Sequence, residues 1–273
     1  MKCAYNAGIL DAFLDNDIGF DYVIGVSAGS ANAASYLAGQ RGRNIRFYTL
    51  HNRSPEYFGA RPFFRDGNLF NLPYVYGDLT NSDGIDPIDH KAMMDNPAEF
   101  RIVATDAMTG LPRYFSKDEI VRDDYRVIMA SCAMPAACRP VIIDGRPYYD
   151  GGVSDSIPIA RALADGCDRV VAILSNPRDF VKRPERTRPA YTVLCRQYPD
   201  IVRDLDRRHK DYNRAKELLL RLESEGRAFV FAPPFRLGTF TTDKAELREL
   251  YNIAVADCCA RGQELEEFLN KRV

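Results

Sequence analysis

The chain has 273 residues, 46% of them hydrophobic, and carries 37 Lys and Arg against 38 Asp and Glu, a formal net charge of −1. This size and apolar fraction support a substantial hydrophobic core without disulfides or structural metals. Because the balanced charge creates no overall field that attracts a polyanion, we expect no nucleic-acid partner. Any contact with a membrane surface would be local and transient.

The chain shows no obvious membrane, secretion or metal-binding signal. The longest run without a charged residue or histidine, 22–40, contains Ser, Asn and Gly and falls short of the roughly 20 apolar residues of a spanning helix. The apolar run after Lys2 ends at Leu10, which is too short for a secretory signal. The 7 cysteines include no C-x-x-C pair and no histidine at ligand spacing. We therefore expect a cytoplasmic protein with reduced thiols and neither metal nor organic cofactor.

Hydrophobic periodicity predicts alternating strands and helices. In chain order we expect a helix at 4–14, a strand at 20–26, a helix at 28–37, strands at 100–105 and 112–116, a helix at 125–133, and strands at 141–143 and 168–174. The last of these has the composition of a buried parallel strand. Two long helical segments, 193–224 and 243–269, follow and are separated by a strand at 228–231. This alternation predicts an α/β fold with a mainly parallel sheet.

No composition shift marks a linker, so we expect a single domain over residues 1–273. Its motif-bearing part covers about 1–175 and its helical C-terminal part about 190–273.

The clearest chemical signal is the G-x-S-x-G sequence formed by Gly25, Val26, Ser27, Ala28 and Gly29, between a predicted strand and a predicted helix. A serine on such a sharp turn is presented clear of the backbone, and flanking glycines remove side chains that would collide there. The N–H of Ala28 and the helix N-terminus would stabilise a developing oxyanion. The alternatives are an ordinary βα turn or a phosphate loop, although the G-x-x-x-x-G-K-[ST] spacing is missing.

A second motif, Asp150, Gly151 and Gly152, follows a β-like run and precedes a helix start with Pro158 in its first turn. Functional carboxylates are commonly carried on such loops. A simple Asp-Gly turn is the alternative. We expect the nearby Asp155 to cap the helix that Pro158 enters rather than to act as a base.

The two motifs, together with Asp21–Gly29 (DYVIGVSAG), Ser131–Pro135 (SCAMP) and Arg139–Arg161, resemble bacterial members of the patatin-like phospholipase family. The resemblance implies a three-layer α/β/α fold in which Ser27 is the nucleophile and Asp150 its general base. It also implies hydrolysis of lipid or other acyl esters through an acyl-serine. With an ordinary pKa of about 3.9, Asp150 would be ionised at neutral pH and able to accept the serine proton. We do not expect His51, His90 or His209 to act as catalytic partners.

The chain departs from that family at its N-terminus. The family opens with a strand and a G-G-G-x-[R/K]-G loop that supplies oxyanion donors, and Met1-Lys2-Cys3 would match only the end of this loop. By this comparison the first strand and most of the glycine-rich loop are missing. Lys2 and Cys3 join Ala28 as oxyanion candidates. Either the true start lies upstream, or the protein is a catalytically impaired member that binds lipid or protein, since losing one oxyanion donor costs about 10²–10³ in rate.

Two further segments have competing interpretations. Arginines at 41–53 precede a run of aromatic residues at 57–76, which could face lipid or form an acyl-binding wall. We favour a loop-rich cap whose aromatic residues are core, because prolines interrupt any long helix. The basic loop at 182–188 is interpreted as a solvated turn in preference to a headgroup site.

Overall fold

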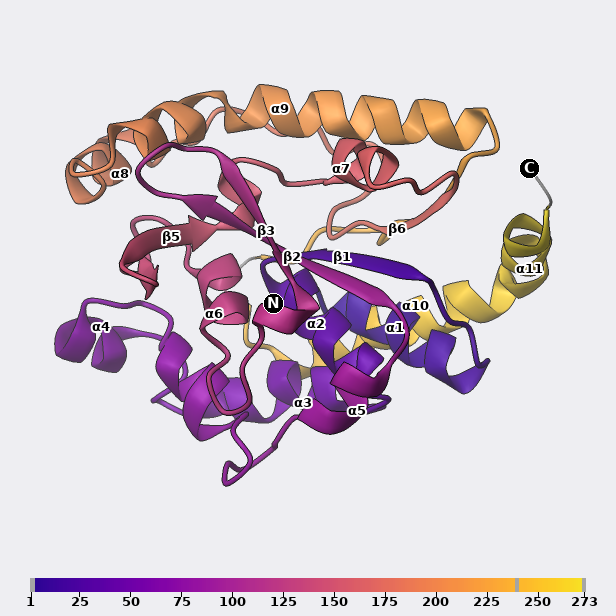
Figure 1. Ribbon diagram of the computed structural model, residues 1–273, viewed down its shortest axis with the longest axis horizontal. Coiled ribbons are helices and arrows are strands. Elements are labelled where there is room, and N and C mark those ends of the chain that lie inside the picture. The colour runs from indigo at the N-terminus through magenta and orange to yellow at the C-terminus, as the bar shows by residue number, and fades with distance from the viewer. Residues whose placement is uncertain (1–2, 239–240, 272–273) are drawn as a thin grey trace.

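The computed structural model describes residues 3–238 and 241–271. Its strands lie between two helical layers, so the expected three-layer α/β/α fold is confirmed (Figure 1). The upper layer in that view contains α7 (Ile159–Ala164), α8 (Arg188–Leu194) and α9 (Pro199–Ser224). The lower layer contains α1 (Ala4–Asp15), α2 (Ala28–Leu37), α3 (Arg43–Thr49), α5 (His90–Asp95) and α10 (Lys244–Ala260). The remaining α-helices of the described residues are α4 (Ala60–Asp66), α6 (Arg126–Cys132) and α11 (Gly262–Asn270).

The central sheet is mixed. β1 (Tyr22–Val26) pairs in parallel with β2 (Glu99–Asp106). Antiparallel pairs join β2 to β3 (Pro112–Ser116), β2 to β5 (Arg146–Asp150), and β5 to β4 (Val141–Ile143). A separate parallel pair consists of β6 (Val170–Ile173) and β7 (Ala228–Phe231).

The expectation of a mainly parallel sheet is therefore wrong, and short connections explain why. β4 and β5 are joined by only Asp144 and Gly145, whose φ angles of 48° and 76° are those of a two-residue hairpin turn. The short β2–β3 connection turns at Gly110, which also has a positive φ, 71°. Parallel pairing needs a crossover far longer than either connection.

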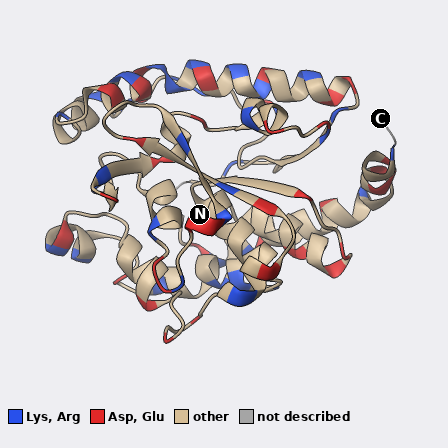
Figure 2. Cartoon of the chain, viewed as in Figure 1, with Lys and Arg blue, Asp and Glu red and all other residues tan. Residues whose placement is uncertain are grey.

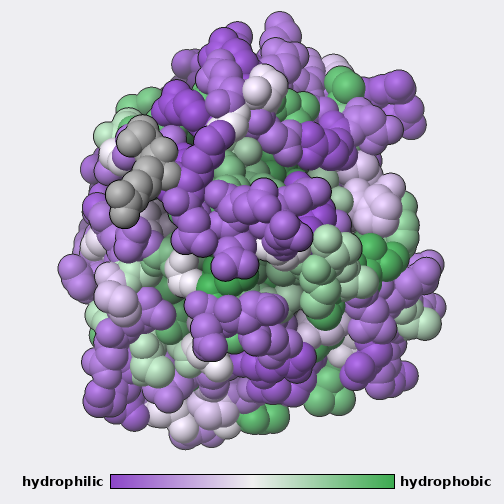
Figure 3. Space-filling view, turned by 90° about the vertical axis from the view of Figure 1, so that its right-hand side faces the viewer, coloured by the Kyte–Doolittle hydropathy of each residue, from purple (hydrophilic) through white to green (hydrophobic). Residues whose placement is uncertain are grey.

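A cavity of about 270 Å³ separates β1 from β6, and residues of both strands line it. Within residues 3–238 and 241–271, β1 pairs with β2 alone, and the first strand implied by the family resemblance has no counterpart. The residues of β6 are half-buried, not fully buried as expected, because they border this cavity. The view in Figure 3 shows hydrophobic residues recessed between hydrophilic ones on the side of the molecule to the right in Figure 1.

The C-terminal helices pack back onto the N-terminal one. Tyr251 Oη on α10 donates a 2.8 Å hydrogen bond to Asp11 Oδ2 on α1, and Tyr5 Oη donates to Asp257. The two helices approach so closely that a Cβ at Gly8 would lie 2.4 Å from the Tyr251 carbonyl oxygen. Both expected long helical segments are interrupted: Pro199 starts α9 after a break from α8, and Arg261 separates α10 from α11.

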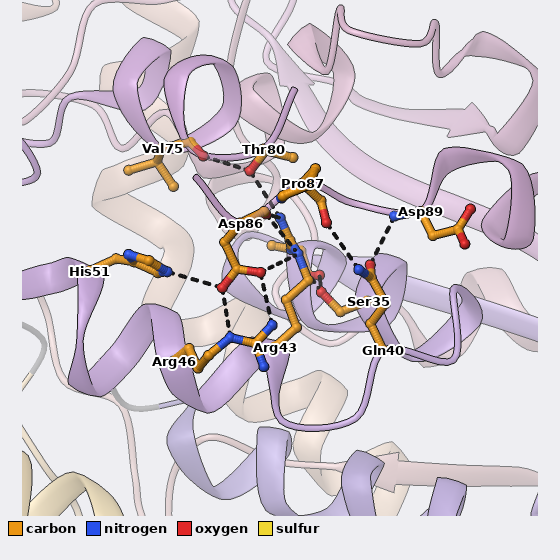
Figure 4. A network of polar contacts seen from close by, with 11 residues as sticks. Ser35, Gln40, Arg43, Arg46, His51, Val75, Thr80, Asp86, Pro87 and Asp89 are labelled. Carbon is orange, nitrogen blue, oxygen red and sulfur yellow. Dashed lines mark hydrogen bonds and ion pairs between the residues drawn. The ribbon is translucent and has the colours of Figure 1, made fainter. Parts of the chain in front are cut away.

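A buried carboxylate holds the loop region after α3 in place. Asp86 accepts two 2.8 Å hydrogen bonds from Arg46 and lies 3.0 Å from His51 Nε2 (Figure 4). The buried Arg43 guanidinium donates to the Asp86 carbonyl oxygen at 2.8 Å and to Thr80 Oγ1 at 3.1 Å. These contacts tie the segment that contains residues 80–86 to α3.

The aromatic residues at 57–76 are mostly core, as expected. Tyr57 and Val75 are buried with Phe47 and Leu79 in one cluster. Phe63 and Phe64 are the exceptions, with 45% and 84% of their surfaces exposed. Within the described residues, no helix combines the length and apolar character needed to cross a bilayer. Acidic and basic side chains alternate along α9, as Figure 2 shows, in keeping with the balanced net charge.

Candidate active site

The structure brings the two sequence motifs together. Ser27 Oγ donates a 2.5 Å hydrogen bond to Asp150 Oδ2 across 123 positions of sequence. Strand β2 brings the two residues together. Its residue Val103 pairs with Val26 of β1, and the next residue, Ala104, pairs with Asp150 of β5. The serine follows the last residue of β1, and the aspartate is the last residue of β5. Two strand ends flanking β2 thus form the site.

Ser27 occupies a strained turn between β1 and α2, with φ 54° and ψ −131°. Non-glycine residues rarely adopt such a positive φ, and these conformations gather at functional sites. Gly25 is required here, because a Cβ would lie 2.5 Å from the Ser30 Cα. A Cβ at Gly29 would meet nothing within 4 Å, so the expectation that both flanking glycines prevent a collision is wrong for Gly29.

Ser131, on α6, holds the turn formed by residues 25–29, which we call the nucleophile elbow. Its Oγ accepts a 2.8 Å hydrogen bond from the Ser27 N–H and donates a 2.6 Å bond to the Val103 carbonyl oxygen. The residue is fully buried. No role for Ser131 was expected from the residues themselves. The one available signal was that it opens the SCAMP segment of the family resemblance.

The carboxylate is held equally firmly. Gly152 N–H donates to Asp150 Oδ1 at 2.7 Å, and the backbone N–H of Asp150 donates to the Ala133 carbonyl oxygen at 2.8 Å. Thr105 Oγ1 on β2 donates to the Asp150 carbonyl oxygen at 2.9 Å. A side chain at Gly151 is impossible, because its Cβ would lie 2.1 Å from the Val103 carbonyl oxygen. The D-G-G sequence therefore serves to aim Asp150 at the serine.

Burial governs the electrostatics of Asp150, which is 4% exposed. Burial raises the pKa of its carboxyl, while the positive charge of Arg208 and the hydrogen bond from Ser27 oppose this rise. The hydrogen bond from Gly152 and the charge of Lys182 act in the same direction as Arg208. The ordinary pKa assumed from the sequence is thus corrected upward. A raised pKa makes the carboxylate a better proton acceptor once it is ionised.

Arg208, on α9, reaches the Asp150 loop from the upper layer. Its Nε donates to the Gly152 carbonyl oxygen, which also accepts a 2.7 Å bond from Ser156 Oγ. A Cβ at Gly152 would lie 3.0 Å from both Arg208 Nη2 and Asp150 Oδ1. No local sequence signal marks this contact, because Arg208 lies in a run of charged residues typical of a solvated helix face.

The three oxyanion candidates lie in different surroundings. Ala28 is the first residue of α2, so its N–H belongs to the first turn, whose amides have no intrahelical carbonyl partner. Cys3 is the N-cap residue of α1, and its carbonyl oxygen accepts a 3.1 Å bond from Asn32 Nδ2. It lines the same cavity as Gly25 and Gly29. Lys2 lies outside the described residues.

Other polar residues lie apart from the dyad. Asp155 accepts a 2.7 Å hydrogen bond from Tyr114, and α7 begins without a side-chain cap, so the expected capping role is wrong. Within the described parts of the chain, no histidine hydrogen-bonds Ser27 or Asp150; His51, for example, contacts Asp86. No group of three potential metal ligands occurs in residues 3–238 and 241–271.

Comparison with known proteins shows which family the chain belongs to. The sequence profile of the family described as patatin-like phospholipase matches residues 1–163, and a profile of a domain of unknown function (DUF6363) matches residues 198–270. A relative, the uncharacterized protein YjjU of Escherichia coli K12, is 28% identical over 183 residues, which cover 66% of this chain and 51% of that protein. The chain thus spans about half the length of this curated relative. With more than half of its residues matched by one profile, the chain belongs to the patatin-like phospholipase family.

Proposed function

We propose that the protein is a serine acyl hydrolase that cleaves carboxylic esters of lipids through an acyl-Ser27 intermediate. The observation that carries this proposal is the 2.5 Å hydrogen bond from Ser27 Oγ to Asp150 Oδ2. A serine in a strained backbone conformation that donates to a buried carboxylate is an arrangement suited to nucleophilic catalysis.

The reaction would proceed in two halves. Ser27 Oγ attacks the acyl carbonyl carbon while Asp150 takes the hydroxyl proton, and collapse of the tetrahedral intermediate expels the alcohol, which receives that proton. Water then attacks the acyl-serine, again giving a proton to Asp150, and the second collapse releases the acid and restores the Ser27 hydroxyl. No step requires a metal or organic cofactor.

The negative charge on the oxygen of the tetrahedral intermediate would be stabilised at the start of α2. The N–H of Ala28 and the partial positive charge of the helix N-terminus lie directly after the nucleophile. The preceding N–H, that of Ser27, is committed to Ser131 and holds the turn in shape. Of these two amides, the N–H of Ala28 is therefore the candidate donor to the oxyanion.

Hydrolysis of p-nitrophenyl butyrate tests the proposal. Ser27→Ala removes the nucleophile and Asp150→Asn removes the base, so each is expected to lower kcat by a factor on the order of a thousand or more. Ser224→Ala, at an exposed helix end, is the matched control and should keep parental activity. Near-parental turnover by either dyad variant would contradict the assignment of Ser27 and Asp150.

A second candidate is a catalytically impaired member that binds lipid or protein. It is favoured by one observation: of the three oxyanion candidates, only Ala28 places a first-turn amide next to the serine within the described residues. A folded chain that binds acyl esters without turnover, in both the parent and the Ser27→Ala variant, would support this alternative.

We further propose that the chain forms a single domain. A single domain is supported by the packing of α10 on α1 and by the reach of Arg208 from the C-terminal part to Gly152. The substrate is proposed to be a lipid or another acyl ester, met through a local and transient surface contact, with no nucleic-acid partner. A cytoplasmic location stays a prediction.

A further inference from the structure

A second cavity, of about 60 Å³, lies beside the nucleophile elbow. It borders Ala28, which follows Ser27 in the chain and whose N–H is the candidate donor to the oxyanion. Its wall is formed by α2, by α3 and by the aromatic segment at 57–76, and includes Ala31, Phe47, Tyr48, Tyr57, Val75 and Tyr76. The cavity therefore adjoins the place where an acyl group would be attached to Ser27.

Tyr76 connects the wall of this cavity to the dyad on a second side. Its Oη lies 3.0 Å from Cys132 Sγ. Cys132 follows Ser131, the residue that holds the Ser27 N–H. Burial raises the pKa of the Cys132 thiol, and the nearby negative charge of Asp150 raises it further. The cavity is therefore close to the dyad both at Ala28 and at Tyr76.

Polar groups of the cavity wall are bonded to neighbouring protein groups. Tyr48 Oη donates a 2.8 Å hydrogen bond to Asn32 Oδ1. Thr80 Oγ1 donates to the Val75 carbonyl oxygen at 2.7 Å and accepts from Arg43 Nη2 at 3.1 Å (Figure 4). Because these groups already have partners, they need no polar ligand. Together with the aromatic and aliphatic wall, this makes the cavity suitable for a hydrocarbon chain.

The volume of the cavity limits the length of such a chain. One water-sized group needs about 15 Å³ of cavity, so the cavity holds roughly four non-hydrogen atoms. A longer chain would have to displace the wall, and protein interiors resist this because they are closely packed. Tyr57 and Val75 are 7% and 5% exposed and pack in one cluster with Phe47 and Leu79. This cluster therefore bounds the cavity firmly.

The larger cavity between β1 and β6 suits a hydrocarbon chain less well. In a β-strand, the N–H and C=O groups of successive residues point to opposite edges. The N–H of Glu99 donates to the Asp21 carbonyl oxygen, so Asp21 and every second residue after it direct these groups to β2. Tyr22, Ile24 and Val26 therefore direct theirs to the larger cavity. A hydrocarbon chain in that cavity would leave these polar groups without partners.

We propose that the cavity beside Ala28 is the acyl pocket and that it selects esters of short acids, with acyl chains of about four carbons. Ala31 and Val75, small side chains of its wall, set the length that it accepts. Esters of butyric acid, such as glycerol tributyrate, fit this description, whereas esters of long-chain fatty acids do not. The inference rests on the proposed acyl hydrolase function and adds a chain length to it.

Ala31 and Ala33 provide a matched pair of positions for the test. Both are on α2, but Ala31 lines the acyl pocket, whereas Ala33 lines the larger cavity between β1 and β6. Replacement by leucine adds the same isopropyl group at either position. Ala31→Leu therefore fills the acyl pocket, and Ala33→Leu fills the larger cavity. Circular dichroism shows whether each variant is folded.

Kinetics with p-nitrophenyl acetate, butyrate and octanoate measure the chain-length preference. For the parent, kcat/KM is expected to be highest for butyrate and at least about tenfold lower for octanoate. Ala31→Leu should lower the butyrate-to-acetate ratio of kcat/KM about tenfold, and Ala33→Leu should leave it unchanged. Val75→Ala enlarges the pocket and should raise the octanoate-to-butyrate ratio.

Each of these results is a ratio between two substrates, so a smaller fraction of folded protein does not change it. A parent that prefers octanoate to butyrate would overturn the proposal. A chain-length profile that changes in Ala33→Leu but not in Ala31→Leu would also overturn it, because the acyl chain would then lie in the larger cavity.

Binding to the Ser27→Ala variant tests the pocket without turnover. Ligand-observed NMR with ethyl butanoate should show binding, and adding Ala31→Leu to this variant should weaken it about tenfold, whereas adding Ala33→Leu should not. If this pattern is found but the parent hydrolyses no ester, the acyl hydrolase function fails while the pocket stands. If the parent hydrolyses butyrate and octanoate equally well, the pocket fails while the hydrolase function stands. Absence of ethyl butanoate binding would also overturn the pocket.

Discussion

The backbone N–H of Ser27 donates its hydrogen bond to Ser131 Oγ, 104 positions further along the chain. Because the same hydroxyl donates to the Val103 carbonyl oxygen, one buried side chain couples the elbow to the strand that also holds Asp150. The conformation of the nucleophile thus depends on α6 and β2 as well as on its own G-x-S-x-G sequence.

Ser131→Ala is expected to leave the partly buried Ser27 N–H without its hydrogen-bond partner. An unsatisfied buried donor costs about 1–3 kcal/mol, so kcat for p-nitrophenyl butyrate should fall about tenfold or more and the free energy of unfolding should decrease. Kinetics and urea unfolding check both effects. A variant that keeps parental kcat would show that this bond does not hold the elbow.

Gly25→Ala and Gly29→Ala are expected to differ in stability although both remove a glycine of the elbow. A Cβ at Gly25 collides with the Ser30 backbone, so Tm should fall by several degrees. A Cβ at Gly29 enters open space within a helix, where alanine is favoured over glycine by up to about 1 kcal/mol, so Tm should stay or rise. Thermal unfolding followed by circular dichroism measures both, and equal losses of Tm would contradict this difference in crowding between the two positions.

Asp150→Asn is expected to stabilise the fold increasingly as pH rises. Burial raises the pKa of Asp150, so the folded chain binds this proton more tightly than the unfolded chain does. The resulting stabilisation is complete below the ordinary aspartate pKa of about 3.9 and is lost as pH rises through the folded value. Asparagine does not ionise and avoids this loss. Urea unfolding at about pH 5 and pH 8 should show that the free energy of unfolding of the variant exceeds that of the parent by more at pH 8. A difference between variant and parent that is independent of pH would contradict the raised pKa.

Arg208→Gln is expected to move the acidic limb of the kcat/KM profile to higher pH. The positive charge of Arg208 lowers the pKa of Asp150, so its removal lets burial raise that pKa further. The neutral ester p-nitrophenyl butyrate isolates this effect from substrate charge. Arg207→Gln removes the same charge from the neighbouring position, where the side chain pairs with Asp204, and should leave the profile in place. Identical profiles for the two variants would contradict the effect of the Arg208 charge on the pKa of Asp150.

Local sequence patterns anticipate those features that one segment encodes by itself. The helix at 28–37 and the strands at 112–116, 141–143 and 228–231 have the predicted bounds, because periodicity and β-branched or aromatic content are local properties. The direction of the strands was wrongly predicted, because alternation of strands and helices does not exclude hairpins such as the one at Asp144-Gly145.

The candidate site also combines residues that local motifs predict with contacts that they do not predict. Ser27 and Asp150 could be predicted because each lies in a motif, whereas their 2.5 Å contact depends on strand pairing. Ser131 and Arg208 reach the site from separate segments, and nothing in their immediate sequence distinguishes a buried polar contact from a solvated helix face. Tertiary proximity decides their roles.

Covalent labelling by a fluorophosphonate, followed by mass spectrometry of the tryptic peptides, tests the Ser27–Asp150 assignment most directly. The probe reacts with a serine activated by its base, so the parent should be labelled at Ser27 and Asp150→Asn should be labelled far more slowly. Ser27→Ala should remain unlabelled. A folded parent protein that takes up no label at Ser27, or an Asp150→Asn variant labelled as fast as the parent, would contradict the proposed dyad.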